Sequence, residues 1–188
     1  MAAHVLVPLK ALDDAKSRLA GALAPRERAT LMLELLDGVV AAVREAGIER
    51  ITLVTREPLS LPGVERFDDR GLAWNDALTA AMREVVAEPV ATIVSADLPL
   101  LRAEEVRALI EATPERGIAI ASATDGGTNA VSMRPAGAAR TCFGEPQSAR
   151  LHAQLAREAR LEHAIVDLAG LAFDLDTPED LERRRAAA

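Results

Sequence analysis

Three aspartates stand where the chain is expected to leave a β-strand, a position from which carboxylates can hold a divalent metal ion. Asp97 follows the nearly continuous apolar run 89–95, and a proline two residues later fixes the turn so that the carboxylate points into the crevice. Asp174 and Asp176 alternate at the end of a short predicted strand, 172–175, which puts both on one face. Because Mg²⁺ binds one or two carboxylates together with water and substrate phosphates, this pattern predicts a magnesium site.

Basic residues follow the first predicted strand, 5–8. Lys10, Lys16 and Arg18 lie in the loop after it, where a phosphate ligand of a parallel sheet would approach. From Lys10 to Arg28 five basic residues stand against three acidic ones, on a chain with a net charge of -7. This segment therefore predicts a local positive field for an anionic ligand. The loop lacks a Walker-type glycine motif, which disfavours ordinary P-loop chemistry.

Two further segments could hold the other end of a ligand. A glycine-rich segment ends in Thr128 and Asn129, so its backbone N–H groups and the threonine hydroxyl could cradle a carboxylate or phosphate. The loop 143–148 leads into a predicted helix that starts at Ser148 and carries the basic His152. An anion could bind at that helix N-terminus.

Two more polar residues are candidates for weaker reasons. Asn75 lies at the start of the predicted helix 73–87 and could present its amide to a base or a ribose, whereas its neighbour Trp74, the only tryptophan, is of a type that more often packs. Cys142 is the only cysteine, so it forms no disulfide within the chain. It has no histidine beside it in sequence, and we expect it to be chemically inert.

Each of these segments also has a structural alternative. Asp97 could cap a helix or a turn, and Asp176 or Thr177 could cap the last predicted helix. The basic loop could be solvated surface, the glycine-rich segment a plain turn, and Ser148 the cap of a surface helix. Taken one at a time, the segments leave both interpretations open.

The elements that must position these residues alternate between strands and helices. We expect strands at 5–8, 50–55, 89–95, 117–122, 130–133, 164–167 and 172–175, and helices at 25–47, 73–87, 102–111, 148–159 and from 177 onward. This alternation predicts an α/β fold with a mostly parallel sheet and helices on both of its faces. Such sheets bind ligands beyond the carboxyl ends of their strands, which is where the candidate residues lie.

Length and composition limit the possible functions. With 188 residues, 49% of them hydrophobic and 27% charged, the chain fits one globular domain over 1–188. The net charge of -7 and the scarcity of aromatic residues argue against nucleic acid as a partner. The apolar runs are too short for a membrane span, and the N-terminus has no basic leader, so we expect a cytoplasmic protein.

Taken together, these motifs resemble the guanylyltransferase family of coenzyme F-420 biosynthesis, the CofC and FbiD proteins, over nearly the whole chain. The matching strings are Val7-Pro-Leu-Lys10 with Ala15-Lys-Ser-Arg-Leu19, Trp74-Asn-Asp-Ala-Leu78, Ala96-Asp-Leu-Pro-Leu-Leu101, Asp125-Gly-Gly-Thr-Asn-Ala130 and Asp174-Leu-Asp-Thr-Pro-Glu-Asp-Leu181. The combination is specific, although many nucleotidyltransferases share the acidic strand end and the Asp-Thr-Pro-Glu-Asp ending. The resemblance implies a Rossmann-like, GT-A-like fold that transfers GMP from GTP to a three-carbon phosphorylated acid and releases pyrophosphate.

The resemblance also implies roles for individual residues. Lys10, Thr128, Gly144 and Ser148 match family positions on the acid side, and Asp97 matches the magnesium ligand. We choose Asp176 as the second metal ligand, although Asp174 stays an alternative. Together with the residue pattern, this predicts catalytic roles for Lys10, Lys16, Arg18 and Asp97, acid binding by Lys10, Thr128, Asn129, Gly144 and Ser148, and nucleotide binding by Pro8, Lys16, Arg18, Asn75 and Asp97. One loop departs from the family: its Phe-Gly-Pro-Gly-Ser reads Phe143-Gly-Glu-Pro-Gln-Ser148 here. This departure leaves open whether the acid is 2-phospholactate, phosphoenolpyruvate or 3-phosphoglycerate.

The implied reaction needs no serine, cysteine or histidine nucleophile, because the attacking phosphate oxygen is already ionised at neutral pH. The expected cofactor is Mg²⁺, the co-substrate is GTP, and the enzyme could form a homodimer. Two alternatives stay open: another small-molecule nucleotidyltransferase, of the cytidylyl or molybdopterin-guanylyl type, and a noncatalytic GTP-binding regulator.

Overall fold

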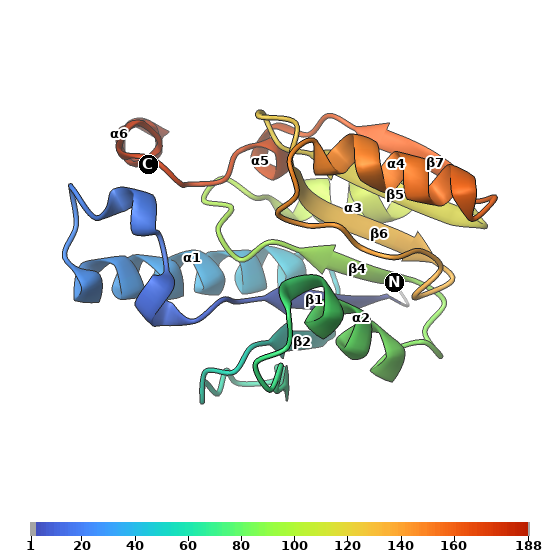
Figure 1. Ribbon diagram of the computed structural model, residues 1–188, viewed down its shortest axis with the longest axis horizontal. Helices are drawn as coiled ribbons and strands as arrows, with labels where there is room; N and C mark the ends of the chain where they lie inside the picture. The colour runs from blue at the N-terminus through green and yellow to red at the C-terminus, as the bar shows by residue number, and fades with distance from the viewer. Residues whose placement is uncertain (1–2, 188) are drawn as a thin grey trace.

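A seven-stranded sheet runs through the molecule in the computed structural model, which describes residues 3–187 (Figure 1). The strands are β1 (His4–Pro8), β2 (Arg50–Val54), β3 (Glu65–Phe67), β4 (Ala91–Val94), β5 (Gly117–Ser122), β6 (Thr128–Arg134) and β7 (Glu162–Val166). The helices are α1 (Pro25–Glu45), α2 (Trp74–Glu84), α3 (Ala103–Glu111), α4 (Ser148–Glu158), α5 (Ala169–Ala172) and α6 (Pro178–Ala187), with short 3₁₀ turns η1 (Leu12–Asp14) and η2 (Ser17–Leu19). No helix in the described part of the chain is long and apolar enough to cross a membrane.

The strand order is β3-β2-β1-β4-β6-β5-β7, and one strand runs against the rest. β6 pairs antiparallel with β4 and with β5, whereas every other pairing within residues 3–187 is parallel. The register places Ala130, near the start of β6, opposite Val94, the last residue of β4. An antiparallel strand begins where its parallel neighbours end, so β6 brings its first residues to the carboxyl edge of the sheet.

Hydrophobic clusters cover both faces of this sheet. Along β1, Val5 and Val7 pack into the cluster formed with α1 and α3, whereas Leu6 packs on the opposite face, against α2 and α4. In Figure 1, α4 lies in front of the sheet and α3 behind it. All five residues of β1 are buried, as expected for a central parallel strand, where the side chains alternate between two covered faces. The predicted α/β fold, with a mostly parallel sheet and helices on both faces, is confirmed.

The predicted elements match the structure apart from the unpredicted short helix α5, the 3₁₀ turns η1 and η2, and three further differences. β3 is missing from the prediction because its three residues are only partly covered and show no apolar pattern. Thr128 and Asn129, expected in a loop, are the first residues of β6. The predicted strand 172–175 is wrong: α5 ends at Ala172, and an irregular segment follows it. The periodicity of two in that segment comes from buried Phe173 and Leu175, which fill the core without pairing to a strand.

Backbone contacts hold that irregular segment beside β4. The Leu175 N–H donates to the carbonyl oxygen of Asp97 at 3.1 Å, which ties the two acidic segments together. Upstream, Gly170 in α5 packs so closely that a Cβ there would collide with the Leu100 carbonyl oxygen and the Glu105 carboxylate. The Glu105 carboxylate also accepts the Gly170 N–H at 2.7 Å. The absence of a side chain at Gly170 therefore lets α5 pack directly against the backbone of Leu100, four residues before the chain reaches Asp174.

We predict that Gly170→Ala lowers the free energy of unfolding by about 1–3 kcal/mol, because the added methyl group has to displace backbone. Gly38→Ala is the matched control: Gly38 lies in α1 with nothing within 4 Å of the added Cβ, so this change should leave stability equal or raise it by up to about 1 kcal/mol. Urea titration followed by circular dichroism measures both. A Gly170→Ala protein as stable as the parent would contradict the close approach.

Candidate active site

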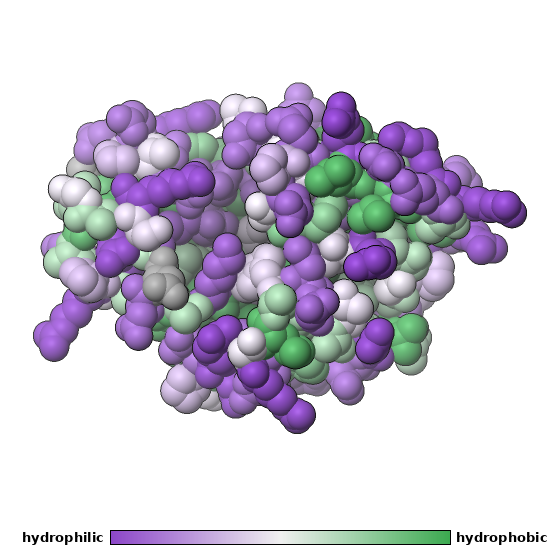
Figure 2. Space-filling view, viewed as in Figure 1, coloured by the Kyte–Doolittle hydropathy of each residue, from purple (hydrophilic) through white to green (hydrophobic). Residues whose placement is uncertain are grey.

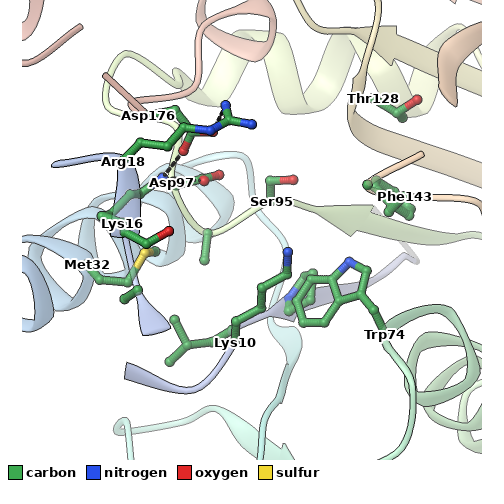
Figure 3. Close-up of a pocket in the computed structure, with 16 residues that line it drawn as sticks. Lys10, Lys16, Arg18, Met32, Trp74, Ser95, Asp97, Thr128, Phe143 and Asp176 are labelled. Atoms are coloured by element: carbon green, nitrogen blue, oxygen red, sulfur yellow. Dashed lines mark hydrogen bonds and ion pairs between the residues drawn. The ribbon is translucent and has the colours of Figure 1, made fainter. Parts of the chain in front are cut away.

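A cleft of about 340 Å³ opens at the carboxyl edge of the sheet, beyond β1 and β4 (Figure 3). It is lined by eight of the residues singled out from the sequence, namely Pro8, Lys10, Lys16, Arg18, Asp97, Thr128, Gly144 and Asp176. Asn75, Asn129, Ser148 and Asp174 lie outside this lining. The fold therefore gathers residues from the N-terminal loop, the β4 end, the β6 start and the C-terminal segment into one place.

Three carboxylates cluster at one side of the cleft, two of them, Asp97 and Asp176, in its lining. Asp97, Asp174 and Asp176 each offer an oxygen atom, and these atoms lie within 4.8 Å of one another. Burial raises the pKa of Asp174, and the nearby Asp97 carboxylate raises it further. The Asn129 side-chain N–H groups donate to the Leu171 carbonyl at 2.9 Å and to Asp174 at 3.2 Å. Asn129 thus fixes the third carboxylate of the cluster from behind.

Lys16 neutralises part of this negative charge. Its Nζ lies 2.6 Å from Asp97 Oδ2 and 2.8 Å from Asp176 Oδ1, and its side chain is only 4% exposed. Burial disfavours the charged lysine, but the Asp97 and Asp176 carboxylates outweigh burial, so the pKa of Lys16 lies above its usual value. Arg18 adds an exposed ion pair to Asp176 at 3.2 Å. Lys16 therefore occupies the position between two carboxylates that a cation favours.

The caps of the last helix settle one alternative left open by the sequence. The Asp180 carboxylate accepts the N–H groups of Asp176 and Thr177, at 3.0 and 2.8 Å, and the Thr177 hydroxyl at 2.8 Å. In return, the Thr177 hydroxyl accepts the Asp180 N–H at 3.3 Å. Capping is thus done by Thr177 and Asp180. The Asp176 carboxylate is left to face Lys16.

Lys10 and Trp74 form another wall of the cleft. Figure 3 shows the Lys10 side chain extending towards Trp74, apart from the acidic cluster, and its Nζ lies 5.0 Å from the centre of the indole ring. A cation over an indole face is attracted by the ring quadrupole. Trp74, expected only to pack, is part of the cleft lining.

Asn75 holds a loop rather than facing the cleft. Its amide accepts the Phe143 N–H at 2.9 Å and donates to the Phe143 carbonyl at 3.0 Å. These two bonds fix the backbone just before Gly144, which lines the cleft with a φ of +81°, a conformation that favours glycine. Direct contact between Asn75 and a nucleotide stays a prediction.

Known proteins resemble this chain over nearly its whole length. The family described as guanylyl transferase CofC like matches residues 3–183. The chain belongs to the CofC-like guanylyl transferase family. A phosphoenolpyruvate guanylyltransferase of Sphaerobacter thermophilus is 42% identical, covering 97% of this chain and 92% of that protein. Another, of Rubrobacter xylanophilus, is 37% identical over 100% of this chain and 95% of that protein.

Solved structures agree with the family at the level of the fold. A 2-C-methyl-D-erythritol 4-phosphate cytidylyltransferase from Thermus thermophilus superposes with a TM-score of 0.61 at 18% identity, covering 100% of this chain and 98% of that one. A CMP:2-keto-3-deoxy-manno-octonic acid synthetase complexed with CTP gives 0.63 at 15% identity, covering 100% and 98%. The CofC-like chain thus has a nucleotidyltransferase fold.

Two features of this CofC-like site lay beyond the sequence pattern. Both aspartates of the C-terminal segment join the cluster, where the sequence left a choice between Asp174 and Asp176. His152, expected as a cation near a helix start, is 1% exposed, and burial lowers its pKa to about 4. The amphipathic pattern of α4 could have placed His152 inside, because it shares a face with buried Ala149, Ala153 and Ala156.

We predict that Lys16→Met destabilises the metal-free protein by about 1–3 kcal/mol, because the Asp97 and Asp176 carboxylates lose their buried counterion while remaining partly hydrated. Added MgCl₂ or MnCl₂ should raise the melting temperature of this variant more than that of the parent, since the ion takes over the role of the ammonium group. Lys10→Met is the control, because Lys10 faces an indole ring. Equal metal-induced shifts in all three proteins would contradict the assignment.

Proposed function

We propose that this chain, as one nucleotidyltransferase domain, joins GMP from GTP to phosphoenolpyruvate and releases pyrophosphate, as a step of coenzyme F-420 biosynthesis. The observation that carries the proposal is that Asp97 and Asp176, which face Lys16 and Arg18 in one cleft, form an acidic cluster with the neighbouring Asp174. A site with both signs of charge suits two phosphate-bearing reactants together with a divalent cation. Membership of the CofC-like family supports the guanylyl group.

The chemistry needs alignment and charge compensation more than a reactive side chain. A phosphate oxygen of the acid forms a bond to the α-phosphorus of GTP, and the bond from that phosphorus to the bridging oxygen breaks, so pyrophosphate leaves with the electron pair. Both reactants are anions and repel each other. The cleft therefore has to hold them together and offset the charge that gathers on the leaving group.

The acidic cluster fits a divalent cation. Carboxylate oxygens are the hard ligands that Mg²⁺ prefers, and Asp97, Asp174 and Asp176 supply three of them within 4.8 Å. Bound there, Mg²⁺ would offset phosphate charge, which is how such ions act in phosphoryl and nucleotidyl transfer. Asp174 extends the pair Asp97 and Asp176 chosen from the sequence; burial and the nearby Asp97 carboxylate raise its pKa, so a neighbouring cation would stabilise its charged form.

The basic residues divide between the two reactants in this proposal. Lys16 and Arg18, next to the acidic cluster, contact the GTP phosphates once a metal ion occupies the carboxylates, with Pro8 beside the nucleotide. Lys10, on the Trp74 side, meets the acid substrate. Thr128 and Gly144 line the far part of the cleft and hold the carboxylate of the acid, while Ser148 supports Thr128 from behind. Asn129, expected to bind the acid, instead donates to Asp174 and supports the acidic cluster.

Phosphoenolpyruvate is our choice among the three acids because the full-length relatives carry that name. Relatives from Roseiflexus and from Chloroflexus aggregans, 35% and 36% identical, are likewise phosphoenolpyruvate guanylyltransferases. The reshaped loop between Gly144 and Ser148 stays compatible with this choice, since Gly144 still lines the cleft and Ser148 still begins α4. Gln147 takes the left-handed conformation, with a φ of +56°, and donates to the Asp125 carbonyl at 3.2 Å.

The surface is consistent with small-molecule partners. On the face shown in Figure 2, hydrophobic residues form small groups among hydrophilic ones. The large exposed hydrophobic side chains of the described residues are Leu72, Val86 and Ile165, which are at least 14 positions apart in sequence. The homodimer expected from the sequence stays a prediction.

The proposed function predicts that the purified protein with Mg²⁺ releases pyrophosphate from GTP only when a phosphorylated acid is present. We expect phosphoenolpyruvate to outperform 2-phospholactate and 3-phosphoglycerate, and GTP to outperform CTP. A coupled pyrophosphate assay with each nucleotide and acid, followed by mass spectrometry of the product, measures this. Preference for CTP would indicate a cytidylyltransferase, and GTP binding without pyrophosphate release would indicate a regulator; either result rejects the proposal.

We predict that Asp97→Asn lowers kcat by at least about 100-fold with the fold retained. The isosteric amide keeps the backbone carbonyl that binds Leu175 but removes the charge that faces Lys16 and the cation. Asp37→Asn, an exposed change in α1, is the matched control and should keep full activity. Near-normal turnover in a folded Asp97→Asn protein would reject the metal assignment.

A further inference from the structure

A chain of buried polar side chains lies behind the part of the cleft farthest from the acidic cluster. Figure 3 shows Thr128 and Phe143 on the side of the cleft opposite Asp97 and Lys16. Behind the Thr128 hydroxyl lie Ser148 Oγ, at 2.9 Å, and His152 Nδ1, at 3.1 Å. Thr128, Ser148 and His152 are 7%, 0% and 1% exposed, so the hydrogen bonds inside this group are shielded from water.

The backbone fixes which nitrogen of His152 carries the hydrogen. The N–H of Cys142 donates to His152 Nε2 at 3.0 Å, and a backbone N–H has no other role than donor. Nε2 must therefore present its lone pair, and a neutral imidazole then carries its hydrogen on Nδ1. Burial, which lowers the pKa of His152 to about 4, keeps the ring neutral at physiological pH. It follows that Nδ1–H is a donor, which the Thr128 oxygen at 3.1 Å shares with the Ser148 backbone carbonyl, whose hydrogen bond to His152 partly offsets the effect of burial on the pKa.

A count of hydrogens shows what this leaves for a ligand. The two hydroxyls of Thr128 and Ser148 hold two hydrogens, and one of these bridges their oxygens. With Ser148 as the donor in that bridge, the Thr128 oxygen accepts from both Ser148 and His152. The Thr128 hydrogen then has no acceptor among residues 3–187, and of the two hydroxyl residues only Thr128 lines the cleft.

We infer that His152 is a positioning residue that makes the Thr128 hydroxyl a hydrogen-bond donor to the carboxylate of the acid substrate. This inference rests on the proposed function, because it requires an acid in the cleft. The backbone N–H of Cys142 sets the tautomer of His152. Neither residue lines the cleft, yet together they determine that the Thr128 hydroxyl donates a hydrogen bond into it. Because the Thr128 hydroxyl is an uncharged donor, it favours a ligand that places an acceptor atom, such as a carboxylate oxygen, within hydrogen-bond distance.

The geometry favours the carboxylate over the phosphate of the acid. The phosphate has to reach the side of Asp97, Lys16 and Arg18, where the charges that assist its attack are gathered. Thr128 lies across the cleft from that group (Figure 3). Lys10, whose Nζ lies over Trp74, is a cation that can balance the carboxylate charge from another wall.

Kinetics of four variants test the inference. Thr128→Val removes the donor and should raise KM for phosphoenolpyruvate about tenfold, with KM for GTP within about twofold. His152→Phe keeps a ring against Phe143 but loses Nδ1–H, and should raise the same KM several-fold. His152→Asn, which retains a donor near Nδ1, should recover most of the affinity. In the double variant with Thr128→Val, His152→Phe should cause no further rise in KM for phosphoenolpyruvate, because His152 acts through the Thr128 hydroxyl.

A pair of inhibitors separates the two ends of the acid. Phosphoglycolate carries a carboxylate and ethyl phosphate does not, so Thr128→Val should weaken inhibition by phosphoglycolate about tenfold and leave ethyl phosphate unchanged. Equal weakening of both would place the hydroxyl on the phosphate and overturn the assignment. His163→Phe is the control, because His163 lies on β7 and contacts Arg157 outside the cleft lining.

A spectroscopic test uses the unaltered protein, since a variant of a buried histidine can lose stability. Long-range ¹H–¹⁵N spectra of protein labelled at its three histidines, assigned with His152→Asn, should show His152 as the neutral Nδ1–H form at pH 7. An Nε2–H or doubly protonated ring would overturn the inference even if turnover is normal. Absence of turnover with every acid would instead reject the proposed function, while the spectrum still decides the state of His152.

Discussion

Everything in the cleft depends on holding three carboxylates together at the edge of a sheet. Like charges within 4.8 Å repel one another; burial raises the pKa of Asp174, and repulsion from the Asp97 carboxylate raises it further. The ion pairs of Lys16 with Asp97 and Asp176 make the arrangement tolerable. The loop that carries Lys16 is itself fixed, because the buried Arg28 of α1 donates to the carbonyl of Ala15 at 3.0 Å. A core helix thus positions the cation that the acidic cluster requires.

The sequence predicts most of the sheet because its central strands are buried on both faces and read as apolar runs. β1, β4 and β5 follow this rule, and α1 shows a regular apolar stripe that ends before Gly47, which has a φ of +84°. The segment after α5 breaks the rule. Phe173 and Leu175 alternate with Asp174 and Asp176 like a strand, yet they pair with no strand. The alternation of apolar and polar residues indicates which side chains are buried. Whether the segment forms a strand depends on pairing partners that are distant in sequence.

Candidate site residues could be predicted when they face the ligand space directly after a strand, as Asp97 does. They could not be assigned when their role depends on a neighbour distant in sequence. Asn75 bonds to Phe143, 68 positions away, and Asn129 bonds to Asp174, 45 positions away. Both are amides that fix a backbone or a carboxylate belonging to another segment. Such supporting residues have no motif of their own, since any element of suitable length can bring the partners together.

The reversed direction of β6 explains why one cleft can treat two anions differently. If β6 were parallel to β4, Thr128 would begin at the opposite edge of the sheet and the cleft would be lined by strand ends alone. Its antiparallel course instead sets a neutral hydroxyl across from the charged cluster. In the proposed role, a Thr128 hydroxyl held by a buried, neutral His152 attracts an acceptor atom at short range and adds no long-range field that would compete with Lys16 for the aspartates. On this proposal, the fold separates recognition of the acid carboxylate, at Thr128 and Lys10, from compensation of phosphate charge at the acidic cluster.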